Sequence, residues 1–248
     1  MRHFNEVQSL LAAYMKPEPY VLRRDENRET GLSFWITLMR EPDPDIALAA
    51  GDCIHNLRSA LDHIIYELSC HSQQQPIDGT AFPIFRDPAN WDSKYRNGKP
   101  RISSGLYKLR AVPDAARKRI ELLQPFQGYT PMYWQRDELL ELHELDIADK
   151  HKNLNLAATR LPDISVGYGW DGPPLKVTHV HEGRLSERDE ILLLRFDPSV
   201  DVQARTQLTT FFEVVFTDPP IEDREVEPTL RNLITAVHSV LTEITSYF

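Results

Sequence analysis

The chain has 248 residues, of which 41% are hydrophobic and 26% are charged, and this predicts one globular domain or two small ones. Lys and Arg number 28 against 37 Asp and Glu, a formal net charge of −9. That balance excludes a nucleic-acid-binding surface spread over the whole protein, but it leaves room for a local basic patch. Two cysteines make no disulfide framework and no apolar run approaches a membrane span, so we expect a soluble cytoplasmic protein with no membrane partner.

The first half of the chain predicts helices around a β-hairpin. Apolar residues at helical spacing indicate a helix over about 3–15, and two β-rich runs between 20 and 40 indicate the hairpin. A long helix follows over about 46–71, where no proline interrupts the apolar stripe. Residues 72–113 are rich in proline and polar side chains, which predicts a long, irregular and partly basic insertion.

The second half alternates helical and β-rich patterns, with β-rich runs between about 153 and 217. The helices predicted beyond residue 100 cover about 102–110, 114–123, 136–153 and 226–246. We therefore predict a single α+β domain over 1–248. Its helical core packs the central helix against the helix over 136–153 and the C-terminal helix, next to an antiparallel β-sheet.

The central helix over 46–71 carries an unusual polar face opposite its apolar stripe. That face lacks Lys and holds residue types common in active sites, namely His55, Arg58, Ser59, Asp62 and Tyr66, with His63 at its edge. One interpretation is a solvated face with an i,i+4 ion pair between Arg58 and Asp62. The other interpretation is a functional site, and the pattern alone leaves both open.

The helix over 136–153 has ionisable groups inside its apolar stripe, because His143, Asp146 and Lys150 share the face of its leucines. A buried charge must be paired, since an unpaired one destabilises the fold by several kcal/mol. We therefore predict that this stripe packs on the polar face of the central helix, with Asp146 or Asp149 engaging Arg58. The resulting network, structural or catalytic, consists of His55, Ser59, Tyr66, His143, Asp146, Asp149, Lys150 and His151.

The sequence RSALDH at 58–63 has an arginine and a histidine five positions apart on a predicted helix. It resembles the Arg-x4-His motif of HEPN-type helical ribonucleases. In those proteins two copies often meet across a dimer, the arginine binds the scissile phosphate and the histidine transfers a proton without a metal. The resemblance implies catalytic roles for Arg58, Asp62 and His63, a homodimer, and no cofactor.

A wider resemblance rests on four segments, GDCIHNLRSALDH, FPIF, QPF and LDIADKHKNL. Together they are similar to a recurrent bacterial protein family. This resemblance extends over much of the chain, but it implies no particular activity.

A basic stretch between residues 94 and 119 contains nine Lys and Arg against one acidic residue, with Tyr95 and Tyr107 interleaved. Cations beside aromatic rings are typical of RNA-binding surfaces, although an ordinary exposed loop has the same composition. The predicted nucleic-acid-binding residues are Lys94, Arg96, Lys99, Arg101, Lys108 and Arg110.

The leading functional hypothesis is a metal-independent endoribonuclease or RNA-binding protein, with RNA and a second copy of the chain as partners. His is the side chain that titrates near neutral pH, and Arg offers a fixed fork of donors to a phosphodiester. Two alternatives stay open. One is a metal-dependent hydrolase that uses His55, Asp62, His143 and Asp146 as ligands between facing helices. The other is a non-catalytic interaction protein whose polar network fixes the register of the helices.

Overall fold

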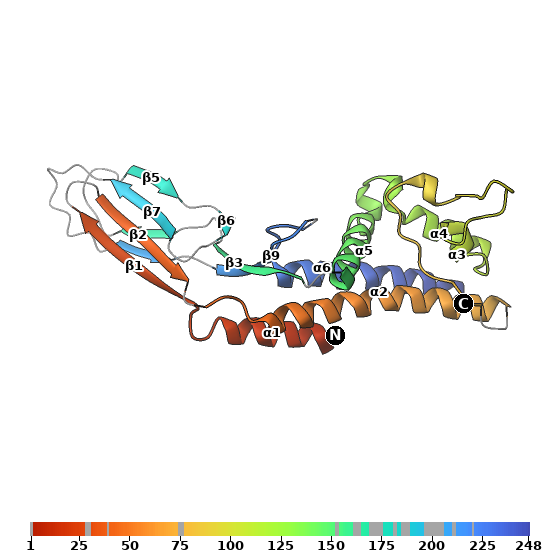
Figure 1. Cartoon of the computed structure of the whole chain (residues 1–248), viewed down its shortest axis with the longest axis horizontal. Coiled ribbons are helices and arrows are strands. Elements are labelled where there is room, and N and C mark those ends of the chain that lie inside the picture. Colours follow the sequence, from red (N-terminus) through yellow and green to blue (C-terminus); the bar gives the residue numbers. More distant parts are fainter. Residues whose placement is uncertain are drawn as a thin grey trace.

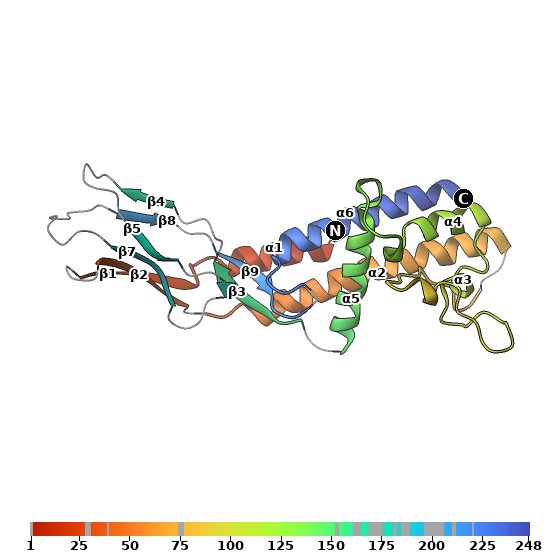
Figure 2. The ribbon, with the colours of Figure 1, turned by 90° about the horizontal axis from the view of Figure 1, so that it is seen from above.

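The protein is elongated, with its helices gathered at one end and most of its strands at the other, as the computed structural model shows (Figure 1). The view from above separates the same two parts (Figure 2). None of the helices in the described part of the chain combines the length and apolar character needed to cross a membrane. The structure describes residues 2–27, 31–38, 40–73, 77–151, 154–160, 165–168, 176–180, 183–184, 189–195, 206–209, 212–219 and 221–248.

Three helices run along the long axis of the molecule and a fourth crosses them (Figures 1 and 2). The first three are α1 (Arg2–Tyr14), α2 (Pro44–Gln73) and α6 (Val226–Ile244), and the crossing helix is α5 (Gln135–His151). The predicted α+β class with a helical core is therefore confirmed. α2 begins at a proline, whose fixed φ angle suits the first turn and whose missing N–H is not needed there.

The core lies where α2 and α6 turn their apolar stripes toward one another. Side chains on these two helices recur at the three- and four-residue spacing of a helical face. Each fully buried Leu or Ile contributes about 1.5–3 kcal/mol relative to an exposed one. The fully or almost fully buried residues are Ile46, Ile54, Leu61, Ile65 and Leu68 of α2, and Leu230, Leu233, Val237, Val240 and Ile244 of α6.

The segment between α2 and α5 is irregular over much of its length, but it belongs to the core. Phe82, Ile84 and Trp91 are buried and pack within the same apolar cluster as α2. The short helices along it are η1 (Pro88–Asn90), α3 (Gly105–Lys108), α4 (Asp114–Leu122), η2 (Pro125–Gln127) and η3 (Pro131–Tyr133).

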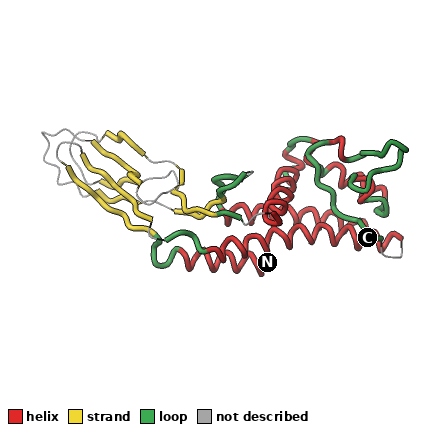
Figure 3. The backbone as a smooth tube through the Cα atoms, viewed as in Figure 1, coloured by secondary structure: helices red, strands yellow, loops and turns green. Residues whose placement is uncertain are grey.

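The strands form three antiparallel groups within the described residues, in the orders β1-β2-β7-β5, β6-β3-β9 and β4-β8. Most of them lie away from the helices (Figure 3), whereas β9 is in contact with α6. Their bounds are β1 (Tyr20–Asn27), β2 (Gly31–Leu38), β3 (Leu156–Arg160), β4 (Ser165–Tyr168), β5 (Lys176–Val180), β6 (Gly183–Arg184), β7 (Asp189–Arg195), β8 (Thr206–Thr209) and β9 (Phe212–Phe216). β9 leads through a short turn into α6, which η4 (Thr245–Tyr247) follows.

A first prediction concerns Gly105, which begins α3 against the buried ring of Trp91. A Cβ atom at this position would lie 2.4 Å from Cε3 of that ring, so either the ring or α3 must move. We expect Gly105→Ala to lower the free energy of unfolding by about 1–3 kcal/mol, the usual effect of overpacking. Urea denaturation measures it. The exposed neighbour change Ser103→Ala should stay within about 0.5 kcal/mol, and equal effects for both variants would contradict the prediction.

Candidate functional site

The predicted packing of the two polar helix faces is confirmed, because α2 and α5 are in contact through polar side chains. Nδ1 of His55 lies 3.5 Å from Oδ1 of the buried Asp146. One turn away, Gly51 leaves room for Asp149, since a Cβ atom on Gly51 would lie 2.4 Å from the Oδ1 atom of that aspartate. Polar groups of the two helices therefore meet on successive turns.

Arg58 is a buried guanidinium that ties α2 to the irregular segment. Only 8% of the residue is exposed, and its Nη2 donates a 2.8 Å hydrogen bond to the carbonyl oxygen of Phe82. Asp62 accepts a 2.9 Å hydrogen bond from the backbone N–H of the same Phe82. Nη1 of Arg58 is 2.9 Å from Oδ1 of Asp62, an ion-pair distance, but it makes no well-directed hydrogen bond. One donor of the guanidinium is therefore left incompletely satisfied.

The expected partner of Arg58 requires a correction. Its carboxylate is Asp62 on its own helix, rather than Asp146 or Asp149 across the interface. The i,i+4 spacing places Asp62 on the same face, and the fixed backbone of the irregular segment holds it there. Asp146 is instead paired with Lys150, whose Nζ lies 2.6 Å from Oδ2.

The charge of Arg58 acts on two basic side chains of other helices, Lys108 and His143, and we call these three residues the anion site. Lys108 ends α3, is partly buried, and has its ammonium 5.5 Å from the centre of the Phe85 ring. Among the residues that the structure describes, no carboxylate lies within ion-pair distance of Lys108. Of the two cations at the site, Arg58 is paired with a carboxylate and Lys108 is not, among the residues that the structure describes.

The electrostatics of the anion site follow from burial and like charge. Burial lowers the pKa of Lys108, and the charge of Arg58 lowers it further. Burial likewise lowers the pKa of His143, with the charges of Arg58 and Lys108 adding to the effect. His143 is therefore neutral at pH 7, and its buried Nδ1 has no hydrogen-bond partner among the described residues.

His63, the second residue of the Arg-x4-His motif, lies on a different face of α2. Five residues at about 100° each separate the two side chains by about 140° around the helix axis. Arg58 is buried toward Phe82, whereas His63 is exposed. A single chain thus does not bring these two groups to one point.

The remaining predicted network residues lie at the margin of the site. Ser59 is partly buried and Tyr66 is exposed on α2, where a hydrogen bond with Cys70 raises the pKa of the Tyr66 hydroxyl. His151 ends α5, and its side chain lies outside the described residues. Burial, followed by the charges of Asp146 and Asp52, raises the pKa of Asp149.

Residues 93–101, which we call the basic loop, form a tight turn that projects from the end of the helical part (Figures 1 and 2). The N–H of Tyr95 donates to the carbonyl of Lys99 at 2.9 Å, and Gly98 adopts a φ of 80°, which favours glycine. The guanidinium of Arg101 lies 5.7 Å from the centre of the Tyr95 ring, and that tyrosine is 45% exposed. The loop exposes four cations: Lys94, Arg96, Lys99 and Arg101.

Arg110 has a structural role that its sequence position did not indicate. It donates to the carbonyl oxygens of Tyr107 and Asp78, and its guanidinium lies 4.1 Å from the centre of the Tyr107 ring. It thereby joins the end of α3 to the turn after α2. Of the predicted RNA-binding residues, Lys108 alone belongs to the anion site.

The four proposed metal ligands do not gather at one point. Across the described ranges, no three His, Cys, Asp or Glu side chains are arranged to hold a metal ion. Asp62 is engaged by Arg58 and a backbone N–H, while Asp146 is engaged by Lys150.

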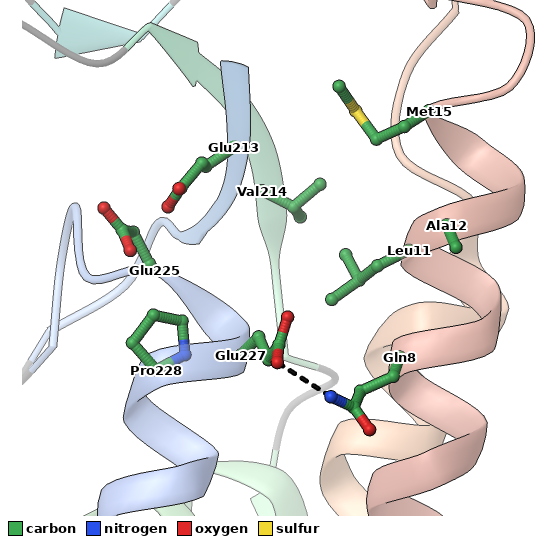
Figure 4. Close-up of a pocket in the computed structure, with 9 residues that line it drawn as sticks. All are labelled: Gln8, Leu11, Ala12, Met15, Glu213, Val214, Glu225, Glu227 and Pro228. Atoms are coloured by element: carbon green, nitrogen blue, oxygen red, sulfur yellow. Dashed lines mark hydrogen bonds between the residues drawn. The ribbon is translucent and has the colours of Figure 1, made fainter. Parts of the chain in front are cut away.

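A cavity of about 300 Å³ lies between α1, β9 and the start of α6. Glu213 and Glu225 point their carboxyl groups toward one another, while Gln8 donates a 2.8 Å hydrogen bond to Glu227 (Figure 4). Burial and the hydrogen bond with Glu225 raise the pKa of Glu213 to about 8. Sequence reasoning missed this cluster, although the short connection from β9 to α6 brings the three glutamates together.

Comparison of the chain with protein-family models, curated proteins and solved structures finds no match. Function must therefore be argued from the geometry and chemistry of the site itself.

A second prediction tests the Arg58–Asp62 pair. Asp62→Asn keeps an acceptor for the Phe82 N–H but removes the charge that balances the buried guanidinium. We expect the free energy of unfolding to fall by about 1–3 kcal/mol, as measured by urea denaturation. Glu67→Gln, the same change at an exposed position of α2, should have an effect within about 0.5 kcal/mol. Indistinguishable variants would show that Asp62 does not stabilise Arg58.

A third prediction concerns Glu213, whose pKa rises from 4.5 to about 8 on folding. Between these values the folded protein holds a proton that the unfolded chain releases, so stability falls as the pH rises through this window. Glu213→Gln should abolish that dependence and raise the thermal unfolding midpoint at pH 8. Glu18→Gln, the same change at an exposed position, should leave the pH dependence intact. If plots of the unfolding midpoint against pH are parallel for wild type and Glu213→Gln, the raised pKa of Glu213 is refuted.

Proposed function

We propose that the protein binds single-stranded RNA, with one backbone phosphate held at the anion site. The observation that carries this proposal is the excess positive charge at the anion site, where Asp62 pairs with Arg58 and no carboxylate of the described residues pairs with Lys108. A phosphodiester supplies the missing negative charge and acceptor oxygens for the ammonium of Lys108. Arg58 provides a rigid fork of donors, and Lys108 provides a compact point charge.

The basic loop supports a polymer rather than a lone phosphate as the ligand. Its exposed cations can follow a phosphate backbone, and the accessible ring of Tyr95 provides a surface on which a base can stack. Only residues 102–104 separate the loop from α3, which carries Lys108. One short segment of chain therefore joins the stacking surface to the anion site.

Metal-independent cleavage of the bound RNA is the enzymatic form of this proposal. RNA carries its own nucleophile in the 2′-hydroxyl group, and Arg58 and Lys108 can neutralise the charge that develops on the phosphate oxygens. Because Arg58 and His63 diverge within one chain, cleavage needs proton-transfer groups at the anion site itself, or His63 supplied by a second copy.

Pairing of two copies in the cytoplasm is part of the same proposal. A groove of about 450 Å³ between α2 and α6 has apolar side chains, among them Leu57, Ala60 and Leu241, beside the first residues of α1. Such a groove offers an apolar surface to a second chain. Sedimentation velocity measures the oligomeric state. Both cysteines are free, which fits a reducing compartment.

The binding experiment uses fluorescence anisotropy with a labelled single-stranded RNA of mixed sequence. We expect Lys108→Ala to weaken binding by about tenfold, equivalent to about 1.4 kcal/mol. Lys16→Ala removes the same charge from an exposed position outside the anion site and should have little effect. Replacing Arg96 and Lys99 by Ala should make the slope of the logarithm of the binding constant against the logarithm of the salt concentration shallower by about 0.7 per charge removed.

Two results would overturn the proposal. One is the absence of binding at low salt, which would leave the non-catalytic interaction protein as the better interpretation. The other is an equal effect of Lys108→Ala and Lys16→Ala, which would remove the anion site from the interface.

A further inference from the structure

Two histidines flank Arg58 at the contact between α2 and α5. His55 precedes Arg58 by one turn on α2, and His143 precedes Asp146 by one turn on α5. Asp146 is in contact with His55, and its charge also acts on His143. The two imidazoles thus share one carboxylate and adjoin one guanidinium.

His143 has the properties of a general base. It is partly buried beside Arg58 and Lys108, and these surroundings disfavour its protonated form. Its Nδ1 atom is buried and lacks a hydrogen-bond partner among the described residues. Nε2 is therefore the nitrogen through which His143 can meet a ligand, and a hydroxyl group that approaches it would place its proton where His143 can take it.

His55 has the complementary properties of a general acid. Its side chain is 57% exposed, and its Nδ1 lies 3.5 Å from the buried carboxylate of Asp146. Because Nδ1 faces the carboxylate, Nε2 is the nitrogen left to donate to a ligand. Lys150 pairs with the other oxygen of Asp146 and fixes its orientation.

We propose that His143 is the base and His55 the acid of RNA cleavage at the anion site, with Asp146 as a positioning residue. This inference rests on the proposed function, which supplies the RNA and its phosphate. His143 removes the proton of the 2′-hydroxyl, O2′ bonds to phosphorus, and the bond from phosphorus to O5′ breaks. His55 gives its proton to the departing O5′. The products are a 2′,3′-cyclic phosphate and a 5′-hydroxyl, and the step needs no oxidant, reductant or further reactant.

The test measures cleavage of a labelled single-stranded RNA by the full chain in EDTA, with RNA binding measured in parallel. His143→Gln and His55→Gln should each reduce the cleavage rate by about a hundredfold or more, the usual contribution of general acid–base catalysis, while binding changes by less than about threefold. The matched control is His71→Gln, which changes an exposed histidine of the same helix that belongs to neither site. It should cleave at the wild-type rate. An RNA with 2′-O-methyl groups should bind and stay intact.

The pH profile tests the role of His143. The rate should rise as His143 loses its proton, with Arg58, Lys108, Lys150 and Asp146 setting where that happens. His143→Gln should remove this acidic limb.

Each adverse outcome points to a different error. RNA that is bound but never cleaved overturns this inference and the enzymatic form of the function, while RNA binding stands. Cleavage that survives in both His143→Gln and His55→Gln, or is lost in His71→Gln, overturns this inference alone. Absence of binding overturns both proposals.

Discussion

The buried guanidinium of Arg58 is the interaction on which the arrangement of the helical part depends. Desolvating it destabilises the fold by several kcal/mol, so its contacts must be fixed rather than exchangeable. The structure meets this demand by joining Arg58 and Asp62 to the two backbone polar groups of Phe82. The irregular segment is thereby held to α2 at one residue, without a regular strand or helix.

That attachment extends to the parts of the protein that follow Phe82 in sequence. The side chain of Gln124 bonds to the carbonyl of Pro83 at 2.8 Å and accepts from the N–H of Phe85 at 3.2 Å, so α4 is tied to the same segment. Phe85 in turn lies against the ammonium of Lys108. The position of the third basic group of the anion site is thus a consequence of where Arg58 holds the chain, even though α3 has only one turn of its own.

Periodicity was enough to predict α2, α5 and α6, because their apolar stripes must face a core and few other conformations present them that way. The same reasoning predicted that the polar faces of α2 and α5 meet, since charges inside an apolar stripe require polar partners. It paired Asp146 with Arg58, however, whereas the structure pairs it with His55. The i,i+4 pair of Arg58 with Asp62 was one of the two interpretations of the polar face. The hydrogen bond from Arg58 to the carbonyl of Phe82 could not be predicted, because Phe82 lies in a segment without periodicity. The pair formed by Glu213 and Glu225 was missed for a related reason. Their contact depends on how a turn joins a strand to a helix.

The distribution of charge allows an acidic protein to bind RNA in the way proposed above. At physiological ionic strength a charge is screened beyond about 8 Å, so the net charge of −9 acts weakly on a phosphate that has reached the anion site. Within that distance Arg58 and Lys108 lie in a partly desolvated setting, where a unit charge interacts more strongly than in water. The acidic remainder disfavours non-specific attachment of nucleic acid elsewhere on the surface. In the proposed complex, affinity is therefore concentrated at the anion site. There, His55, His143 and the 2′-hydroxyl group of the RNA meet only when the phosphate lies between Arg58 and Lys108.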